Sequence, residues 1–240
     1  MDLQDAVMVV TGASSGIGAA TARAAAAAGA RLVLAARRYD RISELAAELP
    51  DAIAVRCDVT DGNQVRAVVD AALGRYGRVD ILVNNAGQGL HVPLESVDPD
   101  DFRAVLELNT VAPLVAMQAV LPAMRAQGGG SIINVSSGTT RRPLPGTGAY
   151  TASKAALDVL STIARAEFAD SGVVVSTVYP FITATEFHRV LRAGAGPVVR
   201  AGGPRPQSAE QVAEVILGLV RSGEPSADLI PVQFGGTYEG

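Results

Sequence analysis

Residues 11–18 read Thr11-Gly12-Ala13-Ser14-Ser15-Gly16-Ile17-Gly18 and join the apolar run Ala6–Thr11 to an alanine-rich stretch with helical character. Glycine permits a tight strand-to-helix turn, and the free amides and dipole of the following helix can then face a pyrophosphate. The G-x-x-x-G-x-G spacing differs from the G-x-G-x-x-G fingerprint and lacks the Gly-Lys-Ser/Thr of a P-loop, so an NTPase is disfavoured. A purely structural turn is the alternative. In this context we predict a dinucleotide site formed by Gly12, Ser14, Ser15, Gly16, Ile17 and Gly18.

Apolar runs alternate with segments long enough for helices, which is typical of βαβ units. The runs do not alternate apolar with polar residues, as expected for parallel strands buried on both faces. We therefore predict one α/β domain over residues 1–240, a Rossmann-type doubly wound parallel sheet of about seven strands with helices on both faces. The expected strands are Ala6–Thr11, Arg31–Ala35, Ile53–Arg56, Ile81–Asn84, Ser131–Val135, Val173–Val178 and a short one at Asp228–Val232. The expected helices are Ile17–Ala28, Arg41–Leu49, Asp61–Tyr76, Asp100–Gln127 with a bend near Pro113, Ala149–Ser171 and Ser208–Ser222.

Composition narrows the class of protein. The 240 residues are 48% hydrophobic and carry 20 Lys+Arg against 24 Asp+Glu, a net charge of -4, so no basic excess exists to bind nucleic acid. Cys57 is the single cysteine, which favours a reducing compartment, and the N-terminus has no signal-peptide pattern. The apolar stretch 108–124 is shorter than a membrane span and is interpreted as a buried helix. We expect a cytoplasmic protein with no nucleic-acid or membrane partner and, since no His/Cys/carboxylate cluster has ligand spacing, no catalytic metal.

Tyr150 and Lys154 are candidates for catalysis. Their i, i+4 spacing puts both on one face of a helix, and Lys154 is the only lysine among the 20 basic residues. A free phenol has a pKa near 10, and a nearby ammonium is expected to lower it. Ser137 follows the fifth predicted strand at its carboxyl end, where open α/β sheets bind ligands. The alternative for Tyr150 is an ordinary half-buried tyrosine, but a compact ammonium kept at one position favours catalysis.

Several motifs occur in an order that resembles the short-chain dehydrogenase/reductase family. They are the glycine turn, Asn84-Asn85-Ala86-Gly87, Asn109, Ser137 and Tyr150-x-x-x-Lys154, over about residues 5 to 185. The resemblance implies that Asn109, Ser137, Tyr150 and Lys154 are catalytic, with Tyr150 as proton donor or acceptor. Asn109 would bend its helix and hold a water that relays protons from Lys154; alone, it could be a capping or interior amide. The family also implies a homodimer or homotetramer that pairs the helices at 100–127 and 149–171.

The end of the second predicted strand, Ala35-Ala36-Arg37-Arg38, indicates the cofactor. An NAD site needs a carboxylate there for the ribose 2′-OH, whereas here Ala36 takes that place and Arg37 can bind a 2′-phosphate. NADP(H) is therefore favoured over NAD(H), with Arg38 and Arg41 expected to be solvated. The resemblance adds the cofactor contacts Asp58, Val59, Asn85, Ala86, Gly87, Tyr150, Lys154, Pro180, Thr183 and Thr185.

Residues 180–207 form a long segment with four prolines and four glycines, interpreted as a substrate-binding lid. Its Thr185–Arg192 portion could become helical when a ligand covers it. Phe181 stands where the family usually has glycine, so substrates cannot simply be carried over from relatives. The expected pocket walls, at 89–92, 139–144 and 181–192, are mainly apolar and suggest an apolar carbonyl substrate. We expect His91 and His188 to line the pocket or the surface rather than act as acid or base.

These observations support an NADP(H)-dependent oxidoreductase that interconverts a carbonyl and a secondary alcohol. A catalytically silent dinucleotide sensor or scaffold is the alternative, although it would not need the proton donor. An epimerase or dehydratase acting on nucleotide sugars shares the Tyr/Lys pair but needs a larger C-terminal substrate domain than the roughly 60 residues after Pro180 provide.

Overall fold

The computed structural model describes residues 1–195, 206–232, 236 and 238. The described part contains a seven-stranded parallel sheet in the order β3-β2-β1-β4-β5-β6-β7. Its strands are β1 (Val7–Thr11), β2 (Arg31–Ala36), β3 (Ala52–Arg56), β4 (Ile81–Asn84), β5 (Gly130–Val135), β6 (Val173–Tyr179) and β7 (Ser226–Asp228). The fold is thus the Rossmann-type doubly wound sheet that the sequence predicts.

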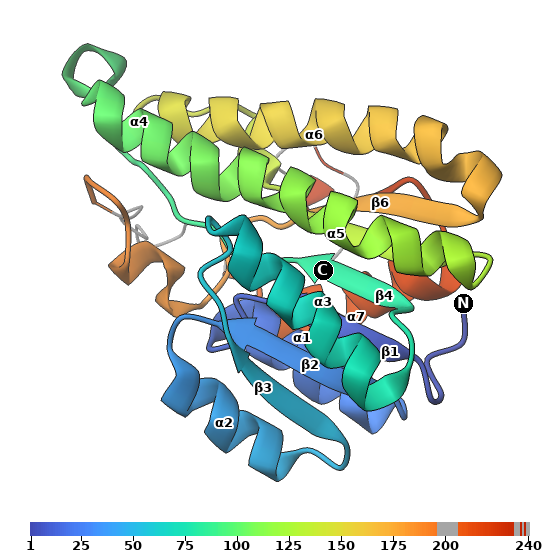
Figure 1. Ribbon diagram of the computed structural model, residues 1–240. Helices are drawn as coiled ribbons and strands as arrows, with labels where there is room; N and C mark the ends of the chain where they lie inside the picture. The colour runs from blue at the N-terminus through green and yellow to red at the C-terminus, as the bar shows by residue number, and fades with distance from the viewer. Residues whose placement is uncertain (196–205, 233–235, 237, 239–240) are drawn as a thin grey trace.

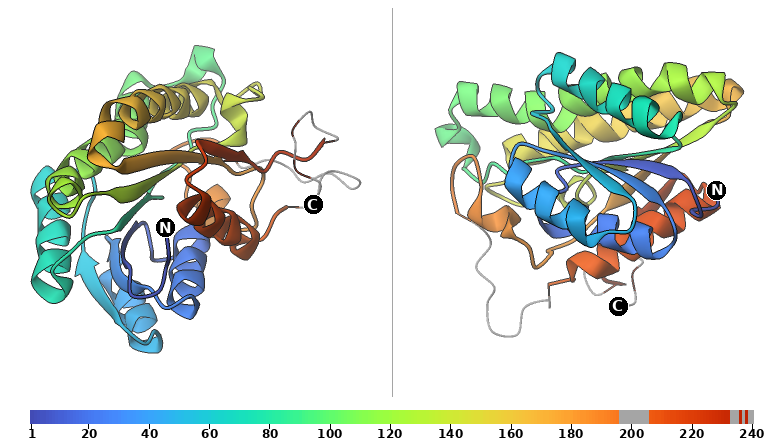
Figure 2. Two further views of the ribbon diagram at one scale, coloured as in Figure 1. Left: turned by 90° about the vertical axis from the view of Figure 1, so that its right-hand side faces the viewer. Right: turned by 60° about the horizontal axis from the view of Figure 1, so that its bottom comes forward.

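Helices cover both faces of the sheet (Figures 1 and 2). They are α1 (Gly16–Ala27), α2 (Tyr39–Glu48), α3 (Gly62–Tyr76), α4 (Pro99–Leu106), α5 (Ala112–Ala126), α6 (Gly148–Phe168) and α7 (Ala209–Ser222). Helices α1, α2 and α7 pack on one face through residues such as Met8 and Leu34, while α3, α5 and α6 pack on the other through residues such as Val9 and Ile132. Alternate residues of one strand therefore enter different cores, which explains the continuous apolar runs.

The strand order places a topological switch point between β1 and β4. From β1 the chain proceeds outward to β2 and β3, then returns to β4 on the other side and continues to β7. Loops that follow neighbouring strands diverge at such a point and leave a crevice at their carboxyl ends. The glycine turn after β1 and the Asn-Asn-Ala-Gly segment after β4 both lie there.

Side chains cap the starts of two helices, α3 and α7. The Asp61 carboxylate accepts hydrogen bonds from the amides of Asn63 and Gln64 at the start of α3. Ser208 and Gln211 form a reciprocal capping box at the start of α7. These side chains satisfy amides that have no partner within the helix, so both starts are fixed by local chemistry.

The helix expected at Asp100–Gln127 is divided by a π-helical turn, Glu107–Val111, which lies between α4 and α5. The irregularity precedes Pro113, where a bend was expected.

By length and composition alone, the helical run Pro99–Ala126 is long and apolar enough to cross a membrane, but 50% of its most apolar stretch is buried inside the protein. Ala116, Met117 and Val120 of α5 belong to the core beside the sheet, as expected for a buried helix.

One element prediction needs correction. The seventh strand is β7, Ser226–Asp228, rather than Asp228–Val232; it is a short edge strand without an apolar run to mark it. The helix expected at 185–192 was tied to a bound ligand and stays a prediction; here the segment after Thr185 forms a 3₁₀ turn, Glu186–Arg189, in which the Phe187 amide donates to the Thr185 hydroxyl. Residues 196–205 of the expected lid lie outside the described residues.

Candidate active site

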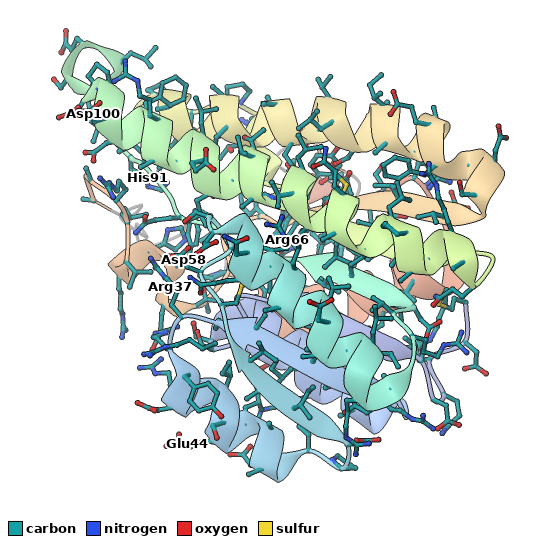
Figure 3. All side chains as sticks on the ribbon, viewed as in Figure 1. Arg37, Glu44, Asp58, Arg66, His91 and Asp100 are labelled. Atoms are coloured by element: carbon teal, nitrogen blue, oxygen red, sulfur yellow. The ribbon has the colours of Figure 1, made fainter. Side chains whose placement is uncertain are left out.

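A cleft of about 800 Å³ opens at the carboxyl ends of the strands. Figure 3 shows Arg37, Asp58 and His91 along this edge of the molecule. Nearly all residues expected in the site line this single cleft: Gly12, Ser14, Ser15, Gly16, Ile17, Arg37, Asp58, Val59, Asn85, Ala86, Gly87, Ser137, Tyr150, Lys154, Pro180, Thr183 and Thr185. Gly18 and Asn109 do not line the cleft but lie next to residues that do, Gly12 and Gly87.

The glycine turn has the geometry of a phosphate cradle. Gly12 and Gly16 have φ angles of 65° and 54°, which favour glycine. A Cβ on Gly18 would lie 2.5 Å from the Gly12 carbonyl oxygen, so its absence lets α1 approach the turn. No side chain caps the first amides of α1, and its first turn has no acidic residue. These amides and the positive end of the helix dipole suit a pyrophosphate, so the residues present fit a dinucleotide.

The Asn-Asn-Ala-Gly segment ties β4 to β1. The Thr11 hydroxyl accepts hydrogen bonds from the amides of Asn85 at 3.0 Å and Ala86 at 3.1 Å. The Asn85 side chain donates to the carbonyls of Thr11 and Gly12. Asn84 donates to the side chain of Asn134 on β5 at 2.9 Å. Buried hydrogen bonds of this kind fix the floor of the cleft.

Ser137 and Tyr150 lie together at the end of β5. The Ser137 Oγ accepts hydrogen bonds from the Thr139 amide at 3.2 Å and from the Thr139 hydroxyl at 3.0 Å. Tyr150 is 6% exposed. Burial raises the pKa of Tyr150 to about 12, while its hydrogen bond with Ser137 acts in the opposite direction. The phenol is therefore protonated at neutral pH and can donate a proton.

Lys154 lies one helical turn beyond Tyr150 on α6 and is 4% exposed. Its Nζ donates to the carbonyl oxygen of Val135 at 2.7 Å. Burial lowers the pKa of Lys154 to about 8, a shift that Asp158 partly opposes. We expected the ammonium to lower the pKa of Tyr150; in the structure desolvation outweighs any such effect, and the pKa of the phenol is raised.

Asn109 is fully buried within the π-helical turn. Its Oδ1 accepts from the Gln88 amide at 3.0 Å, and its Nδ2 donates to the Gln88 carbonyl at 2.9 Å and the Ser153 hydroxyl at 3.0 Å. Built at Gly87, a Cβ would lie 3.1 Å from Asn109 Oδ1 and 3.4 Å from Lys154 Nζ. Asn109 thus holds the loop after β4 against the region of Lys154, a role that the sequence alone left open.

The adenosine end of the cleft has an arrangement that the sequence did not predict. Arg37 lines the cleft, but Arg38 is the residue that donates hydrogen bonds to Ser14 at 3.1 Å and Ser15 at 2.6 Å. Arg38 and Arg41 also pair with Glu186, so they are not the freely solvated side chains we expected. The Asp58 carboxylate lines the cleft, as expected, and also caps a turn by accepting two hydrogen bonds from Thr60.

The segment after β6 forms another wall of the cleft, which runs from Phe181 to the Glu186 carboxylate beside Arg38. Thr183 is 6% exposed, and its hydroxyl donates to the Phe181 carbonyl at 3.1 Å. Phe181, Phe187 and His188 line the cleft. The Phe187 ring lies 5.8 Å from Tyr150, centroid to centroid. Aromatic side chains therefore form much of the wall beside the phenol.

Two roles near the site were not predicted from the sequence, because residue 139 was placed only in a pocket wall and Asp158 was not singled out. Thr139 orients Ser137, and Asp158 lies one further turn along α6 from Lys154, where burial raises the pKa of its carboxyl group. Asp158 has i, i+4 spacing from Lys154, a signal that could have revealed it. Among the described residues no group of three His, Cys, Asp or Glu side chains could hold a metal ion; the absence of a catalytic metal stays a prediction.

The family model of the short chain dehydrogenases matches residues 6–196. The chain belongs to this family. Sulfoacetaldehyde reductase 2 of Chromohalobacter salexigens is 37% identical over 217 residues, covering 88% of this chain and 86% of that protein. Short-chain dehydrogenases are oxidoreductases acting on small molecules, so this chain is an oxidoreductase with a nicotinamide dinucleotide cofactor.

Solved short-chain dehydrogenase structures have the same fold. A member from Burkholderia phymatum in complex with NAD has a TM-score of 0.89 and 27% identity, covering 98% of this chain and 92% of that one. An alcohol dehydrogenase from the archaeon Thermococcus sibiricus, complexed with 5-hydroxy-NADP, has a TM-score of 0.83 and 28% identity, covering 94% and 96%. Similar folds thus hold cofactors with and without a 2′-phosphate.

Proposed function

We propose that this short-chain dehydrogenase interconverts a carbonyl and a secondary alcohol with NADP(H), using Tyr150 as proton donor and acceptor. The observation that carries the proposal is the convergence of Ser137, Tyr150 and Lys154 on the cleft that the glycine turn also lines. Nucleotide and proton chemistry thereby meet in one space, as an oxidoreductase requires.

Each side chain has a defined task in the reduction. Ser137 accepts two hydrogen bonds from Thr139 and shares one with Tyr150, and its hydroxyl turns its own proton to the substrate oxygen when a substrate binds. When bound, the nicotinamide ring supplies the hydride for the carbonyl carbon or accepts it from the alcohol carbon. Tyr150 gives its proton to the substrate oxygen as negative charge develops there, and the positive charge of Lys154 stabilises the phenolate that remains. In the oxidation, the phenolate takes the proton back.

The proposed preference for NADP(H) rests on charge at the end of β2. Ala36 stands where a carboxylate would repel a 2′-phosphate, and Arg37 and Arg38 line the cleft beside it. A charge-assisted contact that NADH cannot make favours NADPH by about ten- to hundredfold. We expect Arg37→Ala to weaken NADPH binding and leave NADH binding nearly unchanged, and Ala36→Asp added to it to invert the preference. Fluorescence titration with both nucleotides measures this; equal affinities in the unmodified protein would refute the assignment.

The catalytic proposal is tested with Tyr150→Phe. Removing the hydroxyl leaves the ring contacts in place but removes the proton donor, so turnover falls by at least about 10²-fold while nucleotide binding persists. A panel of carbonyl compounds followed by NADPH absorbance identifies the substrate class. Near-normal turnover by Tyr150→Phe on the best substrate would remove Tyr150 from the mechanism, and no turnover of any carbonyl by the unmodified protein would favour a sensor.

The remaining assignments concern the setting of the enzyme. We infer a single catalytic domain, in which the described residues 180–195 of the expected lid cover an apolar carbonyl substrate; Leu144, Phe181 and Phe187 on the cleft wall support such a substrate. We also propose a cytoplasmic homodimer or homotetramer without nucleic-acid or membrane partners. Exposed apolar side chains on α6, Val159 and Ile163, support self-association.

A further inference from the structure

Glu186 joins the segment after β6 to the adenosine end of the cleft. Its carboxylate accepts hydrogen bonds from Arg38 at 2.9 Å and from Arg41 at 2.9 and 3.0 Å. These partners are 148 and 145 residues away in sequence. The same Arg38 guanidinium donates to Ser14 and Ser15 of the glycine turn. The Glu186 carboxylate therefore lies against two guanidinium groups at the start of α2, one of which also donates to the glycine turn.

The donors around Glu186 form an anion site at the place where the cofactors differ. Arg38 follows the end of β2, the position whose chemistry distinguishes a ribose 2′-OH from a 2′-phosphate. Arginine forks and serine hydroxyls are typical ligands of phosphate oxygens. The two arginines hold the pKa of the Glu186 carboxyl below its usual range, so this carboxylate is charged at neutral pH.

We propose that Glu186 is a cofactor-specificity residue that competes with the 2′-phosphate of NADP(H) for Arg38 and Arg41. This inference rests on the proposed use of NADP(H). A phosphate carries more charge and one more acceptor oxygen than a carboxylate, so it displaces Glu186 from the arginines. A nucleotide with a 2′-OH has no charge to exchange for the carboxylate and leaves the ion pairs intact.

Displacement of Glu186 reaches the substrate side of the cleft through the next two residues. Glu186 begins the 3₁₀ turn that carries Phe187 and His188. The Phe187 ring packs 5.8 Å from Tyr150, and the His188 ring lies 6.1 Å from His91. Glu186 therefore couples the phosphate on the ribose to the wall of the substrate pocket.

Affinity for two small nucleotides tests the competition without any reaction. Adenosine 2′,5′-bisphosphate carries the phosphate in question, and adenosine 5′-monophosphate lacks it. Glu186→Gln removes the competing charge and keeps the side-chain size. We expect calorimetry at low salt to show about two- to thirtyfold tighter binding of the bisphosphate, since two exposed ion pairs no longer have to be broken. Binding of the monophosphate should change less than about twofold, and the gain should shrink as salt screens the charges.

Glu44→Gln is the matched control. Glu44 is an exposed carboxylate on α2, labelled in Figure 3, and its substitution changes the net charge by the same amount. If Glu44→Gln and Glu186→Gln raise the affinity for the bisphosphate equally, the gain comes from the change in net charge and not from Glu186, and the inference is overturned. Weaker bisphosphate binding by Glu186→Gln would also overturn it, because Glu186 would then be positioning the arginines for the phosphate.

Amide hydrogen exchange of the unmodified protein gives a second readout. The bisphosphate should accelerate exchange over residues 186–190, and the monophosphate should not; equal exchange with both ligands would refute the displacement. A failure of the NADP(H) proposal can be told apart from a failure of the Glu186 proposal. If neither the unmodified protein nor Glu186→Gln binds the bisphosphate, the proposed NADP(H) preference falls together with this inference. If Glu186→Gln leaves the ratio of bisphosphate affinity to monophosphate affinity unchanged, and the unmodified protein reduces carbonyls with NADPH, only the inference about Glu186 is overturned.

Discussion

Replacing Lys154 with Met tests the energetic consequence of burying the catalytic ammonium. Burial lowers the pKa of Lys154 from 10.5 to about 8, and one pKa unit corresponds to about 1.4 kcal/mol. The charged lysine therefore costs the native state about 3 kcal/mol near pH 7. Methionine fills a similar volume without charge, although it gives up the hydrogen bond to the Val135 carbonyl, which is worth about 1 kcal/mol. We expect Lys154→Met to lose turnover and yet to unfold at a higher denaturant concentration.

The pH dependence gives the sharper test. Between about pH 8 and 10 the native lysine has lost its proton while the unfolded lysine keeps it, so the stability of the unmodified protein rises relative to Lys154→Met. Most of the 3 kcal/mol cost should disappear by about pH 10. The raised pKa of Tyr150 acts above its ordinary value of 10.0, where it lowers stability in both proteins alike.

Urea denaturation without nucleotide, at several values from about pH 7 to 10, measures the difference between the two proteins. Leu157→Met is the matched control, because Leu157 is fully buried on the same helix and carries no charge. Its stability relative to the unmodified protein should not depend on pH. A constant difference between Lys154→Met and the unmodified protein across this range would show that the buried amine is not strained by desolvation.

Two other predictions follow from packing. Gly18→Ala forces a Cβ against the Gly12 carbonyl, so it should destabilise the fold by about 1 to 3 kcal/mol and weaken nucleotide binding, as measured by thermal denaturation and titration. The control is Gly218→Ala on α7, where a Cβ would meet nothing within 4 Å, so this variant should be neutral or stabilising. Equal losses of stability in the two variants would contradict the packing argument. Sedimentation velocity at micromolar concentration should show a dimer or tetramer, and Ile163→Asp on the exposed face of α6 should shift it toward the monomer; a monomeric unmodified protein would reject self-association.

The sheet was predictable because its buried strands are made mostly of apolar residues, which the sequence shows directly. Strand β1 is buried along its whole length, and Val7 to Val10 appear as an uninterrupted apolar run. The edge strand β7, Ser226–Asp228, has no such run, so its position was misjudged. A short strand with little burial leaves no periodic signal in the sequence.

The site was predictable where chemistry is local and unpredictable where it depends on distant contacts or on burial. The Tyr150–Lys154 spacing and the glycine turn are short motifs, and the structure brings both to one cleft. Arg38 and Glu186 form an ion pair although they are 148 residues apart, and neither sequence segment contains a pattern that predicts the contact. Spacing alone also missed the direction of the Tyr150 pKa, because the desolvation that raises it comes from the whole fold.

The single lysine has a practical consequence. With Lys154 as the sole side-chain amine in the sequence and only 4% of it exposed, reagents that acylate amines find one side-chain target, at the bottom of the cleft. Its low pKa makes that amine a nucleophile at mildly alkaline pH. The rate at which the side chain is labelled therefore reports how often the cleft admits a small electrophile, and mass spectrometry can read it without any knowledge of the substrate.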